Sequence, residues 1–450
     1  MKPNSGGGFD TACPSLIGTA RAMVVFLCCA WLLVSTSMLT LCAAELRAGL
    51  SKIDITPNQP VRMAGYESRK EPSQGVHDPL GARALALEKD GQHLVLVSLD
   101  NLGFYNKTDE PFRQAILQAC QLKPSELFLC AIHTHSAPTL GWENDKLPSA
   151  NVAYTKGLQN KLVEVVRDAL RVLEPVQPSI CFGASPVGVN RREIVQDGAD
   201  KTKIVLGRNP LRMTDREVQV LKLTRPGANK LAGALFVYET HSTSLGPKNY
   251  LVSGDIHGIA EQFLERYYGD DIVAPGFAGA SGNIDPWVRV LPDFRTNNGW
   301  IPEPVLMGTM LGEEVARVLE GTQTALKNSS IRTAIKTVEL PAKEPASGAG
   351  AGAQSRAPIT ITVGHLGEIA FVGWGGEVFN EIGKSIKAAS PFSHTFIMTH
   401  CNGAAGYLPT RESYLEGGYE VQSSAFGPGA AEGLADETLK MLRELHQAGE

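Results

Sequence analysis

Several side chains that can bind a metal or move a proton follow stretches with the composition of β-strands. His133 and His135 come directly after one apolar run, and His241 comes shortly after a second. Glu377 follows a third run through a glycine-rich turn, and Tyr407 follows a fourth. In α/β sheets, ligands bind beyond the carboxyl ends of the strands. The pattern therefore indicates that several strand ends each deliver a polar group.

A zinc site is one chemistry that these residue types support. Such a site takes nitrogen, oxygen or sulfur ligands, and a catalytic site leaves one position for water or substrate. Two histidines and one carboxylate are a common catalytic set. A single histidine after a strand is more often a hydrogen-bonded structural residue, and His133 and His135 need not face the same metal. The residue pattern by itself leaves both interpretations open.

The segments that must position these residues alternate between short β-rich runs and amphipathic helical runs. The predicted strands are Leu94–Leu99, Leu127–Ile132, Val218–Leu223, Ala232–Glu239, Ile359–Val363, Ile369–Val372 and Thr395–Thr399. The predicted helices are Glu110–Gln121, Val152–Leu173, Ile256–Tyr268, Val305–Leu319, Val378–Lys387 and Ala430–His446. We therefore predict an α/β fold with mixed β-sheets, flanking helices and a metal site at the carboxyl ends of strands.

The composition is that of an ordinary globular protein. The chain has 450 residues, of which 43% are hydrophobic and 20% charged, so it can build a large core. Its formal net charge is -5, and its Lys and Arg residues form no concentrated run. Because binding to nucleic acid needs a clustered basic face, we exclude nucleic acid as the main partner.

Residues 1–44 differ from the rest of the chain. Arg21 precedes an apolar stretch from Ala22 to Leu41, and the following Cys42-Ala43-Ala44 is a small-residue pattern that a signal peptidase can cut. We predict a cleaved signal peptide. The alternative is an uncleaved N-terminal anchor, because about 20 apolar residues span a bilayer. In either case we expect an exported protein: periplasmic, extracellular or anchored to a membrane by this segment.

The cysteines after this leader are few and widely spaced. They are Cys120, Cys130, Cys181 and Cys401. They form no C-x-x-C metal pattern and no disulfide scaffold, although one or two bridges are permitted in an oxidising compartment. We expect buried free thiols that pack as small hydrophobic groups.

One composition break interrupts the rest of the chain. Between Pro341 and Pro358, three glycines alternate with alanines, and such a stretch cannot bury enough apolar surface to order itself. An interdomain linker is one interpretation. Because Glu377 and Tyr407 lie beyond it, we predict instead that 341–358 is a flexible loop within one domain that spans 45–450.

The sequence resembles the catalytic, N-terminal domain of the neutral/alkaline non-lysosomal ceramidases from about Ala48 to about Ala430. The opening stretch and the two segments after it are similar to the start of that family: Ala48 to Pro57, Met63 to Tyr66, and Gly75 to Ala84. More specific is the block from His133 through Thr134 and His135 to Pro138, which resembles the T-H-T-H-S-G-P block of the family.

The resemblance implies a zinc (Zn2+) hydrolase that cleaves the amide bond of an N-acyl lipid such as ceramide by attack of metal-activated water. The implied metal ligands are His133, His241, Glu377 and Tyr407. The expected catalytic residues are His135, Asp285, Tyr419 and Arg191. Among these, His135 is the candidate proton donor or orienting group, and Arg191 corresponds to an arginine of the family's active site.

One position departs from the family pattern. The family has G-[DN]-x-S-P-N, with a serine central to its proposed chemistry, whereas this chain has Asp285 at that place, in Gly282 to Trp287. A carboxylate cannot donate a hydrogen bond to an oxyanion unless it is protonated. We therefore expect Asp285 to hold the water or to bind a hydroxyl or amine of the substrate. We also expect no C-terminal immunoglobulin-like domain, which ceramidases usually have.

Two other functions remain open. The first is a zinc hydrolase of a different amide, ester or acyl-sugar. Asp285 and Trp287 favour this function, because they give that side of the expected site a charge and an indole where the family has small polar groups. The second is a non-catalytic exported binding protein on the same fold, against which the retained metal ligands count. We expect a small-molecule or lipid substrate, which is compatible with peripheral contact with a membrane, and the sequence leaves the oligomeric state open.

Overall fold

The structure is a computed structural model that describes residues 45–143, 147–227, 230–269, 271–287, 303–343 and 355–448. Residues 45–450 form one compact unit. The predicted signal peptide or anchor, 1–44, lies outside the described residues. Among the helices that the structure does describe, none has the length and apolar character needed to cross a bilayer.

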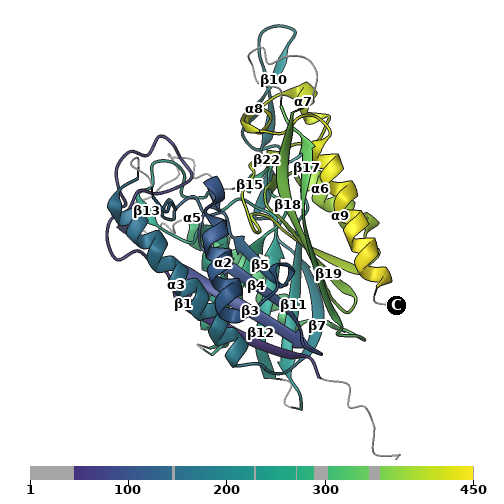
Figure 1. Ribbon diagram of the computed structural model, residues 1–450. Coiled ribbons are helices and arrows are strands. Elements are labelled where there is room, and N and C mark those ends of the chain that lie inside the picture. The colour runs from purple at the N-terminus through teal and green to yellow at the C-terminus, as the bar shows by residue number, and fades with distance from the viewer. Residues whose placement is uncertain are drawn as a thin grey trace, which may run out of the picture. The chain divides into compact units, whose positions relative to one another are not determined.

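Three β-sheets build the unit (Figure 1). The first has the order β5-β4-β3-β1-β6, with bounds Leu127–Ala131, Gln92–Leu99, Gly81–Lys89, Arg47–Asp54 and Glu174–Pro175. The second has the order β14-β12-β11-β7-β16, with bounds Gly276–Ala278, Lys230–Tyr238, Glu217–Arg225, Gln177–Ala184 and Thr324–Ala325. The third has the order β17-β18-β19-β21, with bounds Ile331–Pro341, Arg356–Leu366, Ile369–Trp374 and His394–Met398.

Four two-stranded pairs lie outside these sheets. They are β2 (Gly75–Val76) with β13 (Leu251–Val252), β8 (Gly188–Asn190) with β15 (Ile284–Pro286), β9 (Arg192–Gln196) with β10 (Thr202–Leu206), and β20 (Glu377–Val378) with β22 (Tyr407–Leu408). The last pair is parallel, and its register sets Glu377 directly opposite Tyr407. Two of the predicted metal ligands are therefore neighbours through their backbone.

Each sheet is covered by a pair of helices on one face. The helices are α2 (Asp109–Cys120) and α3 (Ser149–Arg171) on the first sheet, α4 (Asp255–Tyr268) and α5 (Glu303–Glu320) on the second, and α6 (Asn380–Ala389) and α9 (Ala430–Gln447) on the third. Three apolar clusters fill these sheet–helix layers. A fourth cluster joins the other faces of all three sheets, with members such as Leu96, Leu235 and Phe371. The shared core fixes the three sheets against one another, because close-packed interiors resist displacement.

The predicted fold class is confirmed: the chain is α/β with mixed sheets and flanking helices. The strands that carry the candidate site are buried whether they lie inside a sheet or at its end; for example, β19 inside the third sheet and β5 at the end of the first are both buried along their whole length. A strand that is buried on both faces reads as a continuous apolar run, which is why these strands were visible in the sequence.

The predicted loop 341–358 joins two neighbouring strands of the third sheet. β17 and β18 pair in antiparallel register, with Pro341 opposite Arg356. The first residue of the predicted loop and its last three residues therefore belong to strands, and 344–354 lie outside the described residues. The described ends of the segment thus belong to two paired strands of one sheet.

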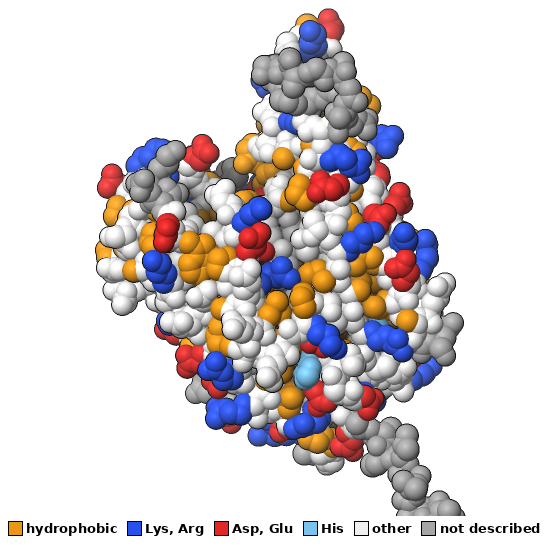
Figure 2. Space-filling model, viewed as in Figure 1, with side chains coloured by type: hydrophobic (Ala, Val, Ile, Leu, Met, Phe, Trp, Pro, Cys, Tyr) orange, Lys and Arg blue, Asp and Glu red, His pale blue; other side chains and the backbone are white. Residues whose placement is uncertain are grey.

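Short helices and turns surround the candidate site. They are the 3-10 turn η1 (Tyr105–Lys107) and the helices α7 (Ser413–Glu416) and α8 (Tyr419–Ser423). A second 3-10 turn, η2 (Pro124–Glu126), precedes β5 at the end opposite to His133. On the face drawn in Figure 2, basic and acidic side chains are interspersed over the surface. That face therefore carries no extended basic patch of the kind that nucleic acid requires.

Candidate metal centre

His133 is held by its backbone and by one ring nitrogen. It follows β5 by two residues and has a left-handed backbone with φ of 61°. Its Nδ1 lies 2.6 Å from the carbonyl oxygen of Leu102. A carbonyl can only accept, so Nδ1 carries the hydrogen and Nε2 presents a lone pair. This is the tautomer that a metal ligand needs.

His241 has the same arrangement on a different strand end. It follows β12 and is fully buried. Its Nδ1 lies 2.8 Å from the carbonyl oxygen of Ser281 and 3.0 Å from that of Ile284, so its Nε2 also presents a lone pair. The loop is tied to the first histidine loop, because Thr134 and Ser242 are bridge partners.

Glu377 completes a triangle of donor atoms. Its Oε2 lies 3.4 Å from Nε2 of His133 and 3.4 Å from Nε2 of His241. Its Oε1 accepts a hydrogen bond of 2.7 Å from the hydroxyl of Tyr105. Burial alone raises the pKa of Glu377, but the nearby His133, followed by His241 and His400, hold it well below its usual range. The carboxylate is therefore ionised at neutral pH.

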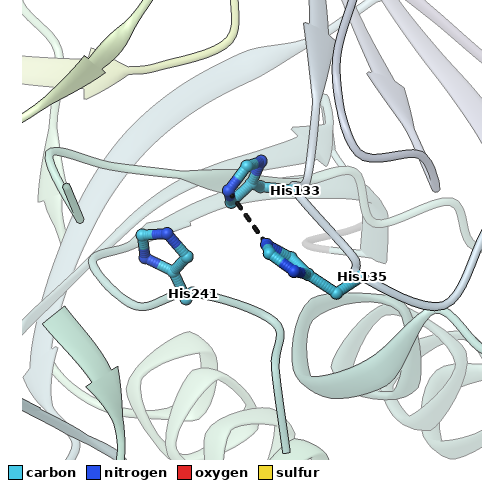
Figure 3. A group of neighbouring side chains, drawn as sticks. All are labelled: His133, His135 and His241. Atoms are coloured by element: carbon cyan, nitrogen blue, oxygen red, sulfur yellow. Dashed lines mark hydrogen bonds between the residues drawn. The ribbon is translucent and has the colours of Figure 1, made fainter. Parts of the chain in front are cut away.

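His135 belongs to the same cluster (Figure 3). Its Nε2 lies 3.2 Å from Nε2 of His133, and donor atoms of His133, His135 and His241 all lie within 4.8 Å of one another. Its ring packs on Gly65, where an added Cβ would meet the ring at 2.6 Å. Gly65 also has a φ of 99°, so both the close approach and the backbone favour glycine there.

These donors fit a zinc ion. Tetrahedral bonds of about 2.05 Å place neighbouring ligand atoms about 3.3 Å apart, and the two 3.4 Å distances from Oε2 of Glu377 to the imidazole nitrogens match that spacing. Nε2 of His241 and Oε2 of Glu377 are buried and make no hydrogen bond to any described residue. Buried polar atoms without partners are costly and usually mark an unrecorded water or ion. Two imidazoles and a carboxylate are also a common catalytic zinc set.

Tyr407 lies directly opposite Glu377 in the β20–β22 pair, and Arg191 contacts its hydroxyl. Arg191 is buried, and its Nη2 donates a 3.1 Å hydrogen bond to the hydroxyl of Tyr407. Its Nε donates a 2.8 Å hydrogen bond to Glu420, and its Nη2 donates a second one, of 2.9 Å, to the carbonyl of Gly282. The guanidinium is thus held on several sides, and it fixes the position of the Tyr407 hydroxyl.

Asp285, the residue that departs from the family pattern, forms ion pairs with two arginines. Its Oδ1 lies 3.1 Å from Nη1 of Arg191, and its Oδ2 lies 3.2 Å from Nη1 of Arg208. The side chain is only 2% exposed. The geometry therefore makes Asp285 a residue that positions Arg191, whereas the sequence led us to expect a contact with water or substrate.

Tyr419 stands at the mouth of the site. It is 45% exposed, and its ring meets that of Tyr407 edge to face at 5.6 Å. A cavity of about 490 Å³ opens beside it and reaches the cluster. The cavity is lined by Arg62, Met63, Ala64, Gly65, Tyr66, Glu67, Leu102, Tyr105, His133, His135, Thr139, Leu147, Glu377, Gly406, Tyr407, Tyr419 and Ser423.

The sequence analysis assigned no role to four residues of the site. Tyr105 bonds Glu377, and His400 stacks on His133 with ring centroids 3.9 Å apart. Glu420 and Arg208 hold Arg191 and Asp285. His400 follows β21 by two residues, as His133 follows β5, so the rule that found His133 could have found it. Tyr105 begins the 3-10 turn η1, Glu420 lies in the short helix α8, and Arg208 follows β10 by two residues. No periodic signal marks these three positions.

The comparisons with known proteins decide the family. The sequence model described as "Neutral/alkaline non-lysosomal ceramidase, N-terminal" matches residues 46–284, which is more than half of the chain. The chain belongs to the neutral/alkaline non-lysosomal ceramidase family. The resemblance expected from the His133 to Pro138 block is thereby confirmed.

Curated ceramidases match over part of their length. "Neutral ceramidase" of Pseudomonas aeruginosa is 28% identical over 272 residues, which are 55% of this chain and 38% of that protein. "Neutral ceramidase 1" of Arabidopsis thaliana is 24% identical over 241 residues, which are 50% of this chain and 30% of that protein. The matched region therefore spans about a third of the length of these ceramidases.

Solved ceramidase structures share the fold. Neutral ceramidase from Pseudomonas aeruginosa superposes with a TM-score of 0.74 at 19% identity, covering 90% of this chain and 75% of that chain. A structure titled "Ceramidase complexed with C2" gives 0.73 at 18% identity, with 90% and 76% covered. At such identities the likeness concerns the fold, and it confirms the α/β architecture of this member of the family.

Proposed function

We propose that this chain is a zinc-dependent hydrolase that cleaves the amide bond of an N-acyl lipid such as ceramide. The observation that carries the proposal is the convergence of Nε2 of His133, Nε2 of His241 and Oε2 of Glu377, with separations of 3.4 Å. Membership of the ceramidase family supports the substrate class. Tyr407 is the proposed fourth ligand, because its backbone pairs with Glu377 and its hydroxyl is fixed by Arg191.

Zinc held by these residues would supply a water acidic enough to act as hydroxide near neutral pH and a positive charge beside the substrate carbonyl. His135 is the proposed proton donor to the leaving nitrogen, because its ring lines the cavity at the edge of the cluster. Tyr419 lines the same cavity from its mouth and is the proposed group that positions the substrate or its oxyanion. Arg191 and Asp285 act by holding Tyr407.

A second candidate substrate class is a different amide, ester or acyl-sugar. The observation that favours it is Asp285, which stands where the family has a serine. Its carboxylate pairs with two arginines, Arg191 and Arg208. The cavity is also lined by charged and hydroxyl-bearing side chains, including Arg62, Glu67 and Tyr66. Such groups suit a substrate with polar substituents near the scissile bond.

We also propose that the protein is exported and that residues 1–44 act as its signal peptide or anchor. The support for this is the apolar stretch from Ala22 to Leu41 and the small residues that follow it. We also propose peripheral contact with a membrane, because the proposed substrate is a lipid; family membership supports both. Fractionation of cells that express the tagged full chain tests export and membrane contact, and retention in the cytosol would contradict them.

The experiment that tests the zinc assignment compares three proteins: wild type, His241→Ala and the control His93→Ala. His93 lies near the start of β4, whereas the cluster follows the far ends of strands. Zinc per chain is measured by elemental analysis, and hydrolysis is measured on fluorescent ceramide, short acyl esters and N-acetyl sugars. We expect one zinc in wild type and His93→Ala, and loss of zinc and turnover in His241→Ala.

The outcomes separate the candidates. Turnover of ceramide alone supports the first substrate class, and turnover of esters or acyl-sugars without ceramide supports the second. A His241→Ala protein that keeps both its zinc and full activity would refute the metal assignment. A zinc-loaded wild type without activity on any substrate would point to a binding protein. His135→Ala adds a finer test, because a proton donor can be removed with zinc retained, whereas a ligand cannot.

A further inference from the structure

Two buried cysteines are neighbours across a backbone bridge beside the candidate metal centre. Cys130 lies in β5, three residues before His133, and Cys401 directly follows His400. Cys130 belongs to the first sheet and Cys401 follows β21 of the third sheet, and the two are antiparallel bridge partners. Cys130 is 1% exposed and Cys401 is 0% exposed, and both are thiols in this structure.

The backbone register around this pair is the one that brings side chains closest. The amide of Ala131 donates to the carbonyl of His400 at 3.3 Å, and the amide of Asn402 donates to the carbonyl of Leu129 at 2.9 Å. These bonds flank Cys130 and Cys401, which therefore form a non-hydrogen-bonded antiparallel pair. Such pairs have Cα atoms about 4.5 Å apart, which is inside the range of about 4.4 to 6.8 Å that a disulfide accepts.

The pair is also fixed by its surroundings. The side chain of Asn402 accepts a 3.1 Å hydrogen bond from the amide of Leu129 and donates a 2.8 Å hydrogen bond to the carbonyl of Leu127. Gly373 of β19 lies against Cys401, and a Cβ at that position would collide with the sulfur atom. The sulfur of Cys401 therefore has a space that glycine keeps open, next to the Cys130 side chain.

The backbone on both sides of the pair is strained. His133, His400 and Asn402 all have a left-handed backbone, with φ of 61°, 52° and 53°. Non-glycine residues keep this conformation only when the surrounding structure imposes it. His133 and His400 also stack on each other, with an interplanar angle of 13°. A covalent link between their two segments would hold this strained arrangement.

We propose that Cys130 and Cys401 form a disulfide when the chain folds in an oxidising compartment, and that this bond clamps the segments that carry His133 and His400. The two thiols lose two protons and two electrons to an external disulfide of the glutathione or disulfide-oxidoreductase class. That oxidant is reduced to two thiols. The sequence led us to expect free thiols at both positions, because their separation of 271 positions hides their contact.

The burial of the two thiols determines when the oxidant can reach them and the bond can form. Burial, followed by the contact with Cys401, raises the pKa of the Cys130 thiol well above its usual value. Thiolate is the reactive form, so the folded, reduced protein oxidises slowly. The bond forms while the chain is still open to the oxidant, and once formed it is shielded from reductants. The inference does not depend on the proposed zinc function.

Peptide mapping tests the bond itself. The full chain is refolded with a mixture of oxidised and reduced glutathione, free thiols are alkylated under denaturing conditions, and an unreduced digest is analysed by mass spectrometry. We expect a linked peptide that contains Cys130 and Cys401, whereas Cys120 and Cys181 are recovered alkylated. Recovery of Cys130 and Cys401 as separate alkylated peptides after this treatment would overturn the proposal.

Thermal unfolding tests the clamp. Wild type that is refolded and scanned in a phosphine reductant, so that the bond never forms, should unfold about 5 °C below the oxidised wild type, the shift expected for loss of one stabilising disulfide. Cys181→Ala removes a buried cysteine of β7 outside the pair and should keep this response. The double variant Cys130→Ala, Cys401→Ala should not respond to reductant. An equal response in the double variant, or none in wild type, would contradict the clamp, and the mapping result stands even if the double variant does not fold.

Discussion

At the scale of single residues, the site is defined by which atom of each side chain is left free. Nδ1 of His133 and Nδ1 of His241 donate hydrogen bonds to the backbone carbonyls of Leu102 and Ser281, so each Nε2 is directed into the cluster. Glu377 divides its two oxygens in the same way, with one on Tyr105 and the other between the imidazoles. Such supporting hydrogen bonds orient ligands before a metal binds, which is why they affect affinity.

Tyr105→Phe should therefore weaken zinc binding without removing a ligand. The variant loses the 2.7 Å hydrogen bond to Oε1 of Glu377, and loss of such a support raises the Kd for the metal by about 10- to 100-fold. Competition with a chromophoric chelator measures the Kd. Tyr267→Phe, at a tyrosine that is 58% exposed, is the matched control. Unchanged affinity in Tyr105→Phe would show that this hydroxyl does not orient the carboxylate.

Asp285→Ser should destabilise the protein although it restores the family's residue. Arg191 and Arg208 both lose a carboxylate partner in a buried setting, and breaking a buried ion pair costs about 3 kcal/mol. Urea unfolding at pH 7 measures the change. The control Asp197→Ser removes an exposed pair with Lys203 that is 3.0 Å long, and it should cost less than about 1 kcal/mol. Equal effects of the two substitutions would contradict this role.

At the scale of elements, burial decided which strands could be read from the sequence. β5, β19 and β21 are apolar and buried, and they coincide with predicted strands. β3 was missed because its sequence, GARALALEK, is rich in alanine and leucine, which favour a helix. Pairing with β1 on one side and β4 on the other overrides that local preference, because a strand in mid-sheet gains ladder hydrogen bonds along both edges.

The start of α4 carries a pH-dependent term of stability. Burial raises the pKa of Asp255 to about 6, although Ser244 and nearby amides donate hydrogen bonds to it. This folded-state pKa is above the unfolded value of 3.8, so the folded protein binds the extra proton between pH 4 and 6. Stability from this group therefore rises as pH falls from 7 through that window.

Asp255→Asn should remove this pH dependence. The amide cannot ionise, so the gain in unfolding free energy between pH 7 and pH 5 should be smaller in the variant than in wild type. Urea midpoints at the two pH values measure it. Asp168→Asn, on an exposed aspartate of α3, should leave the wild-type gain unchanged. An identical gain in Asp255→Asn and wild type would mean that this carboxylate stays ionised through the window.

At the scale of the whole molecule, the cluster connects the three sheets. His133 follows β5 of the first sheet, His241 follows β12 of the second, and Glu377 follows β19 of the third. A metal bound by all three would act as a crosslink at one end of the shared core. Anything that binds only the folded state stabilises it in proportion to the logarithm of its concentration over Kd.

Removal of zinc should therefore lower the stability of the entire unit. Dialysis against a chelator should cost about 2.7 kcal/mol relative to zinc at 100 times its Kd, and the Tm should recover when zinc is added back. Calorimetry with and without zinc measures this. His241→Ala should have a low Tm that zinc does not raise, whereas His93→Ala should behave as wild type does. A zinc-independent Tm in wild type would exclude the crosslink.

The sequence alone determined the fold class, the main helices, the buried strands and the family, because these depend on local periodicity and short motifs. It also pointed to His133, His241 and Glu377 as strand-end groups. Only the tertiary structure brought together Tyr105, His400 and Arg208, and it gave Asp285 two arginine partners. It also set Cys130 beside Cys401. These contacts join residues far apart along the chain, and periodicity carries no information about which distant turns will meet once three sheets pack on one core.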